Sequence, residues 1–245
     1  MASFSTTATV EDPRISLGGG ATLPPVRGGG DDGRFGSPDY GTRLRRARLG
    51  LLVALTPILM LFVSFTSAYI VRQGLPTLDP RTNTLVRDWI PVKLPRLLFV
   101  NTCVLLLSSV GMELARRQIR REAALAPAVS VSAVSAGEEK KIPWLAMTVV
   151  LGLLFLTGQW MAWRQLAALG YYVSTSPSSS FIYLLTGTHA IHLMGGVLAL
   201  LVAGAASLLR RPVATRSIVV DVTGWYWHFM ALLWVYILSL LEFAR

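Results

Sequence analysis

Five long apolar stretches restrict this chain to a membrane fold. The hydrocarbon core of a bilayer is roughly 30 Å thick, and a helix crosses it in about 20 residues. Stretches of about that length occupy residues 49–71, 94–115, 142–163, 181–209 and 222–241. Of the 245 residues, 53% are hydrophobic and 15% are charged, whereas a soluble domain has roughly 25% charged residues. We therefore expect an all-α integral membrane protein that forms a bundle of five transmembrane helices.

The basic residues of the chain indicate how such a bundle is oriented. The chain has 23 Lys and Arg against 13 Asp and Glu, which gives a net charge of +10. If the spans alternate in direction, 16 of the 23 basic residues lie on the side of the N-terminus. Cytoplasmic loops carry such an excess of Lys and Arg. The pattern predicts the N-terminus inside and the C-terminus outside, and it explains the positive charge without nucleic acid as a partner.

Residues 1–42 differ in composition from residues 43–245. The first segment contains Gly18–Gly20, Gly28–Gly30 and scattered charges, which is typical of a flexible Gly/Pro-rich tail. Residues 43–245 contain all five apolar stretches and are the predicted membrane domain. The one cysteine, Cys103, excludes an internal disulfide and a cysteine-based metal cluster.

All three histidines of the chain fall inside the apolar stretches: His189 and His192 in the fourth, and His228 in the fifth. A polar group inside a membrane is costly, so each histidine marks a candidate site. Imidazoles from two helices can ligate a haem iron. A neutral imidazole can instead form a hydrogen bond with a neighbouring helix or a lipid head group. A bis-haem cytochrome needs four histidines, so hydrogen bonding is the favoured interpretation.

Other polar residues in the spans are Asn101, Gln159 and Glu113. Asn101 and Gln159 are expected to form hydrogen bonds between helices. Glu113 precedes Arg117 by four residues, a spacing that favours an ion pair near the membrane surface. Phosphate loops, dinucleotide fingerprints and nucleophile elbows are absent from the sequence. We therefore expect no catalytic, metal or cofactor-binding residues in this chain.

Two histidine-containing motifs resemble a known family. Thr186-Gly-Thr-His-Ala-Ile-His-Leu-Met-Gly196, followed by Trp225-Tyr-Trp-His228-Phe229, is similar to subunit III of haem–copper oxidases, which include cytochrome c and quinol oxidases. The family's Leu-Asn-Thr segment resembles the sequence at Asn101-Thr102, and a family glutamine matches Gln159. Five spans correspond to the short bacterial form of the subunit, which lacks the first two helices.

The resemblance implies a non-catalytic subunit of a respiratory oxidase in a prokaryotic inner membrane. Haems and copper are then expected in the partner subunits I and II, and this chain would bind subunit I and membrane phospholipid. On this interpretation the candidate residues make contacts to lipid or between helices, and Trp225 and Trp227 anchor the chain at the inner interface. The full set of candidates is His189, His192, His228, Trp225, Trp227, Asn101 and Gln159.

The sequence also departs from the family and leaves alternatives open. Carboxylates found in other members are replaced in Thr56–Met60, in Trp160–Gln165 and at Ala231, so functions of those acids do not carry over. A first alternative is an accessory subunit of nitric oxide reductase, which shares this fold. A second alternative is an electron-transfer subunit that binds haem b through His189 or His192 together with His228. A small transporter is less favoured because no inverted repeat is evident.

Overall fold

The computed structural model describes residues 40–78, 83–86, 89–125, 144–209 and 213–243. Within these ranges, five helices are long and apolar enough to cross a membrane, so the predicted five-helix fold is confirmed. Most of the predicted flexible tail, residues 1–39, lies outside the described residues. The helices are α2 (Tyr40–Gly74), α3 (Leu97–Leu125), α4 (Trp144–Ala168), α5 (Pro177–Leu208) and α6 (Val213–Phe243).

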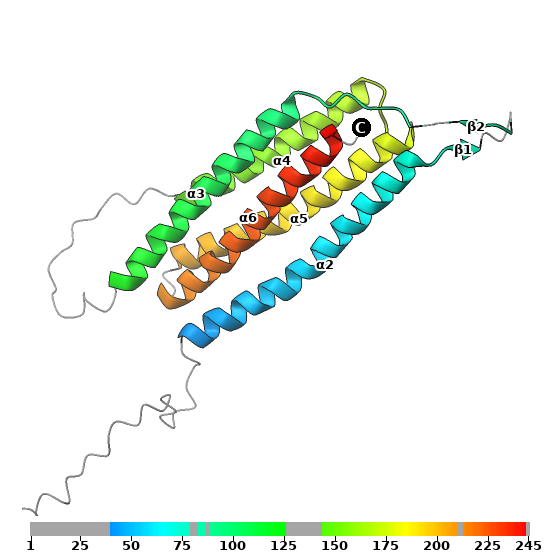
Figure 1. Cartoon of the computed structure of the whole chain (residues 1–245). Helices are drawn as coiled ribbons and strands as arrows, with labels where there is room; N and C mark the ends of the chain where they lie inside the picture. Colours follow the sequence, from blue (N-terminus) through cyan, green and yellow to red (C-terminus); the bar gives the residue numbers. More distant parts are fainter. Residues whose placement is uncertain (1–39, 79–82, 87–88, 126–143, 210–212, 244–245) are drawn as a thin grey trace, which may run out of the picture. The chain divides into compact units, whose positions relative to one another are not determined.

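Helix α6 lies in the middle of the bundle (Figure 1) and packs against α2, α3 and α5. Helix α4 packs against α3 and α5, and α2 packs against α5 and α6. The fully buried side chains that fill the space between these helices include Phe155 of α4, Leu193 of α5, and Trp227, Met230 and Trp234 of α6. The two largest aromatic side chains of the core, Trp227 and Trp234, therefore both come from α6.

Small residues allow the indole of Trp227 to lie between α4 and α5. A Cβ atom added at Gly152 would lie 2.7 Å from Cη2 of Trp227, and one added at Gly196 would lie 3.3 Å from the same ring. A side chain at position 152 would therefore force the Trp227 ring or the helix to shift, because real Cβ atoms do not approach other heavy atoms so closely. Small residues at such positions are the usual way in which membrane helices pack closely.

Helix α2 is the helix least supported by the described bundle. Its buried residues are Phe62, Thr66 and Tyr69, although the helix is 35 residues long. Large apolar side chains such as Val53 (73% exposed) and Met60 (64% exposed) point away from the other helices. A membrane or a partner protein must cover this apolar surface.

A short hairpin connects α2 to α3. Strand β1 (Thr77–Leu78) pairs in antiparallel fashion with β2 (Leu85–Val86), and all four residues are exposed. Helix α3 begins at Leu97, three residues after the start predicted for the second span. Pro95 lies just before it, and the Leu98 amide donates a hydrogen bond to the Pro95 carbonyl. At its other end, α3 continues to Leu125, well beyond residue 115, where the predicted second span ends.

Candidate functional site

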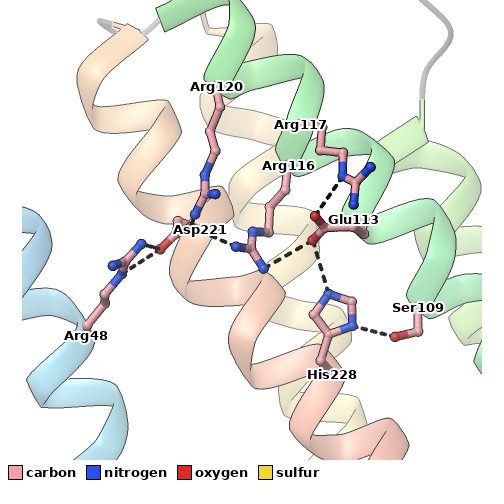
Figure 2. Close-up of polar contacts among 8 residues, drawn as sticks. All are labelled: Arg48, Ser109, Glu113, Arg116, Arg117, Arg120, Asp221 and His228. Carbon is pink, nitrogen blue, oxygen red and sulfur yellow. Dashed lines mark hydrogen bonds and ion pairs between the residues drawn. The ribbon is translucent and has the colours of Figure 1, made fainter. Parts of the chain in front are cut away.

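Arg48 of α2 and Arg116 and Arg120 of α3 converge on the carboxylate of Asp221 of α6 (Figure 2). Asp221 is only 3% exposed. Its Oδ2 accepts hydrogen bonds from Nε of Arg48 at 2.9 Å and from Nη2 of the same guanidinium at 2.8 Å. Its Oδ1 lies 3.4 Å from Nη2 of Arg116 and accepts a short hydrogen bond from Nη2 of Arg120. We call these four residues the Asp221 cluster.

The Asp221 cluster was not predicted from the sequence, in which Asp221 only precedes the fifth apolar stretch. The sequence nevertheless contains features that indicate the cluster. Arg116 and Arg120 are four residues apart and so share one face of α3. Asp221 directly precedes the fifth apolar stretch, at the end of that stretch that is expected to lie on the same side as these arginines. Buried carboxylates require compensating partners, and these arginines were the candidates at the same depth.

Gly224 allows Arg116 to reach the cluster. A Cβ atom at Gly224 would lie 2.4 Å from Cδ of Arg116 and 3.3 Å from its Cγ. The aliphatic part of the arginine thus lies directly against the backbone of α6, one turn after Asp221. The guanidinium carbon is 5.5 Å from the centre of the Trp225 ring, a distance at which the cation is attracted by the aromatic face.

Glu113 forms a second group of contacts next to the cluster. Its carboxylate lies 3.0 Å from Nε of Arg117, so the predicted ion pair is present, and 3.2 Å from Nη1 of Arg116. Nε2 of His228 lies 3.7 Å from the same carboxylate. Arg116 therefore contacts both Asp221 and Glu113, and it joins the two groups into one network (Figure 2).

His228 connects α6 to α3. Its Nδ1 lies 2.5 Å from Oγ of Ser109, within hydrogen-bonding distance. Together with the Glu113 contact, the imidazole thus has a polar partner on each ring nitrogen. The geometry is that of a hydrogen-bonding group between two helices.

The two histidines of α5 have different surroundings. Nδ1 of His192 lies 2.8 Å from the Thr188 carbonyl of its own helix, and its ring packs edge-on against Phe62 of α2. The His192 carbonyl accepts a hydrogen bond of 2.8 Å from the Tyr226 hydroxyl, so the backbone rather than the imidazole makes the polar link to α6.

His189 is completely buried between aromatic rings of α4 and α6. Its ring centre is 5.0 Å from that of Trp234 and 6.1 Å from that of Phe155. Neither of its ring nitrogens has a hydrogen-bond partner among the described residues. In this structure His189 therefore acts as a flat packing group of the core.

The remaining candidates are divided between the core and the surface. Nδ2 of Asn101 donates a hydrogen bond of 3.0 Å to the Phe155 carbonyl and so links α3 to α4. Gln159 is buried, and its Oε1 has no partner among the described residues. Trp225 is 51% exposed, next to Arg116. The interface role predicted for Trp227 is wrong, because this side chain is fully buried in the glycine-lined space between α4 and α5.

These contacts join the helices of the bundle to one another. Among the described residues, no group of three or more His, Cys, Asp or Glu side chains could hold a metal ion. The polar groups form hydrogen bonds and ion pairs between helices, and the charged groups gather where α2 begins, α3 ends and α6 begins. The fold and these contacts define a multi-pass membrane protein whose helices are joined by hydrogen bonds and ion pairs.

The comparisons with known proteins identify the family. Residues 41–243 match the family described as "Cytochrome c oxidase subunit III", and the chain belongs to this family. It is 36% identical over 105 residues to a "Probable cytochrome c oxidase subunit 3" of Mycobacterium tuberculosis (strain ATCC 25618 / H37Rv), covering 42% of this chain and 50% of that relative. The chain's match thus spans half the length of this curated relative.

Longer but less similar matches extend over most of the chain. A "Cytochrome c oxidase subunit 3" of Thermostichus vulcanus is 28% identical over 196 residues, which covers 79% of this chain and 85% of that protein. The protein of the same name from Triticum aestivum is also 28% identical over 196 residues, covering 78% of this chain and 65% of the relative. These relatives support the resemblance to oxidase subunits and give no support to the two alternatives.

Proposed function

We propose that this chain is the non-catalytic third subunit of a haem–copper oxidase in aerobic respiration. The observation that carries the proposal is the family match over residues 41–243. The haems and copper then belong to partner subunits I and II, which carry out the oxygen chemistry. The role of this chain is to bind and stabilise the catalytic subunit and to hold phospholipid against its exposed apolar surfaces.

Helix α2 is the proposed contact surface for the catalytic subunit. It buries three residues in the described bundle, whereas the shorter α4 buries six. A partner on the outer face of α2 would provide the packing that the bundle does not. Val63, which is 57% exposed on α2, is expected to lie in this contact.

The test is co-purification of the complex through a C-terminal tag in mild detergent. We expect subunits I and II to be recovered in near-equal amounts with this chain. Val63→Trp should reduce their recovery, whereas Val150→Trp on α4 should not, although Val150 is similarly exposed (64%). Recovery of a nitric oxide reductase subunit would move the assignment to the first alternative. Recovery of the chain alone with a haem absorption band would support the second.

The proposed location is the inner membrane of a prokaryote, with the N-terminus inside. The basic residues of the Asp221 cluster gather at the end of the bundle where α2 begins, as expected for the cytoplasmic side. The test is labelling of single cysteines in a Cys103→Ser background with a membrane-impermeant maleimide. Arg164→Cys should react in intact cells, and Arg45→Cys only after permeabilisation. The reverse pattern would overturn the orientation.

A further inference from the structure

The Asp221 cluster contains more positive charge than its carboxylate neutralises. Arg48, Arg116 and Arg120 share Asp221, and Glu113 is shared between Arg116 and Arg117. The network drawn in Figure 2 therefore contains two guanidinium groups more than carboxylates. A positive excess this close to the apolar part of a membrane favours an additional anion.

The guanidinium groups also retain hydrogen-bonding capacity. Each has five N–H donors, and the contacts to Asp221 use Nε and Nη2 of Arg48 and Nη2 of Arg120. The Arg116 residue is only 9% exposed, and its Nε is buried and has no hydrogen-bond partner among the described residues. A buried, unsatisfied donor of this kind is costly, and an anion in contact with it would remove the cost.

Arg48 and Arg120 lie where an anion can reach them from the surface of the bundle. Their side chains are 42% and 49% exposed, whereas that of Asp221 is 4% exposed. They approach Asp221 from α2 and α3, which lie on either side of it in Figure 2. An anion that bridges the two arginines can therefore enter from the surface of the bundle while Asp221 stays covered.

The depth of the cluster matches the head-group region of a bilayer. Arg48 directly precedes the uncharged stretch of residues 49–71. Beyond the cluster, the helices continue for about two more turns and are joined there by further polar contacts. The Tyr40 hydroxyl lies 3.0 Å from the Ser217 hydroxyl, and Arg216 lies 3.9 Å from Glu122. The cluster thus lies at the boundary between the apolar span and the polar ends.

We propose that Arg48, Arg116 and Arg120 form a binding site for a phosphate group. Planar guanidiniums bind phosphate oxygens through paired, charge-assisted hydrogen bonds, which suits two arginines that share a carboxylate. The phosphate comes either from the head group of an anionic phospholipid or from free inorganic phosphate. This site would be one place at which the chain carries out its proposed binding of phospholipid. The inference depends on the proposed function only because it requires that the chain lies in a membrane.

The test uses the purified, delipidated oxidase complex that contains this chain. Native mass spectrometry counts the molecules of dioleoylphosphatidylglycerol bound during a titration. The double variant Arg48→Gln/Arg120→Gln should bind the most tightly held lipid about tenfold more weakly, the loss expected for one charge-assisted hydrogen bond. Arg45→Gln/Arg121→Gln is the matched control, because it removes the same two charges from exposed positions on α2 and α3.

Two further arms identify the source of the phosphate. Excess inorganic phosphate that fails to displace the lipid assigns the site to a phospholipid, whereas full displacement assigns it to free phosphate. Equal lipid affinity in the wild type, the double variant and the control overturns the proposal. If the double variant does not assemble, Arg120→Gln alone gives the same comparison, since Arg48 and Arg116 remain on Asp221.

This result is independent of the proposed oxidase function. Recovery of subunits I and II tests assembly, and it is measured on the same preparations. If the catalytic subunits are recovered but the lipid titration does not respond to the arginine variants, the phosphate site fails alone. If the catalytic subunits are not recovered, the subunit proposal fails, and the titration is carried out on the tagged chain in the same detergent.

Discussion

Gly224→Ala should destabilise the bundle by displacing one arginine. The added Cβ would lie 2.4 Å from Cδ of Arg116 and 3.3 Å from Cε of Met112. The methionine end can move, but the arginine is held against the backbone of α6 by contacts at its guanidinium. The substitution therefore forces Arg116 away from Asp221 and Glu113.

The magnitude follows from two opposing contributions. Hydrogen bonds to charged groups contribute about 1.5–3 kcal/mol each, and Arg116 makes two such contacts, of which the 3.4 Å contact to Asp221 is long. Replacing glycine by alanine inside a helix stabilises the helix by up to about 1 kcal/mol. Arg48 and Arg120 still neutralise Asp221. Because the long contact contributes little, we expect a net loss of about 1–2 kcal/mol in the free energy of unfolding, which is roughly a 5–30-fold decrease in the ratio of folded to unfolded protein.

The assay is reversible unfolding of the purified chain in mixed micelles, followed by tryptophan fluorescence. Gly50→Ala is the control, because it is also a helical glycine but has no atom within 4 Å of the added Cβ. In an Arg116→Ala background, Gly224→Ala should no longer be destabilising, which a double-mutant cycle measures. If Gly224→Ala costs the same with and without Arg116, or costs nothing in the wild type, the reasoning is refuted.

Three further substitutions test other contacts by the same unfolding assay. Gly152→Ala should cost about 1–3 kcal/mol, because its Cβ would lie 2.7 Å from the buried Trp227 ring. Asp221→Asn should cost about 3–5 kcal/mol, because it leaves the arginines around a nearly buried site without their carboxylate. Asn101→Leu should cost about 1 kcal/mol through loss of its hydrogen bond to the Phe155 carbonyl.

Each of these substitutions has an outcome that would contradict it. Gly204→Ala is the control for Gly152, because its nearest atom would lie at an ordinary contact distance of 3.8 Å. Equal stability of the two alanine variants would show that Trp227 is not tightly enclosed. An Asp221→Asn variant as stable as the wild type would show that solvent already screens the cluster. Asn101→Leu without any loss would mean that water or lipid replaces the bond.

Much of the fold was predictable from the sequence. The number of spans follows from a comparison of uncharged stretch length with bilayer thickness, and both quantities are local. The ends of α3 were less predictable. The second apolar stretch is short, and the prediction extended it backward to residue 94, whereas the helix starts at Leu97 and extends forward through a basic segment. Arginines continue a helix well, and Pro95 restricts the residue before it.

The candidate site was predictable only in part. The three histidines were found because any polar residue inside an apolar stretch stands out. The partners of these histidines were not predictable from the sequence. In the structure, His228 contacts Ser109 of α3, the ring of His192 contacts a carbonyl of its own helix, and His189 packs among aromatic rings. Which face of a helix meets which neighbour depends on the packing of the whole bundle.

By itself, the sequence determined the five spans, the uneven distribution of basic residues and the family motifs, because each is a property of neighbouring positions along the chain. Only the tertiary structure decided that Arg48 and Arg120 meet at Asp221, across 173 and 101 residues of chain. It also decided that Trp227 is a core residue while Trp225, two positions earlier, faces outward. The physical reason is that burial and ion pairing depend on contacts between helices, and these are established only when all the helices are packed together.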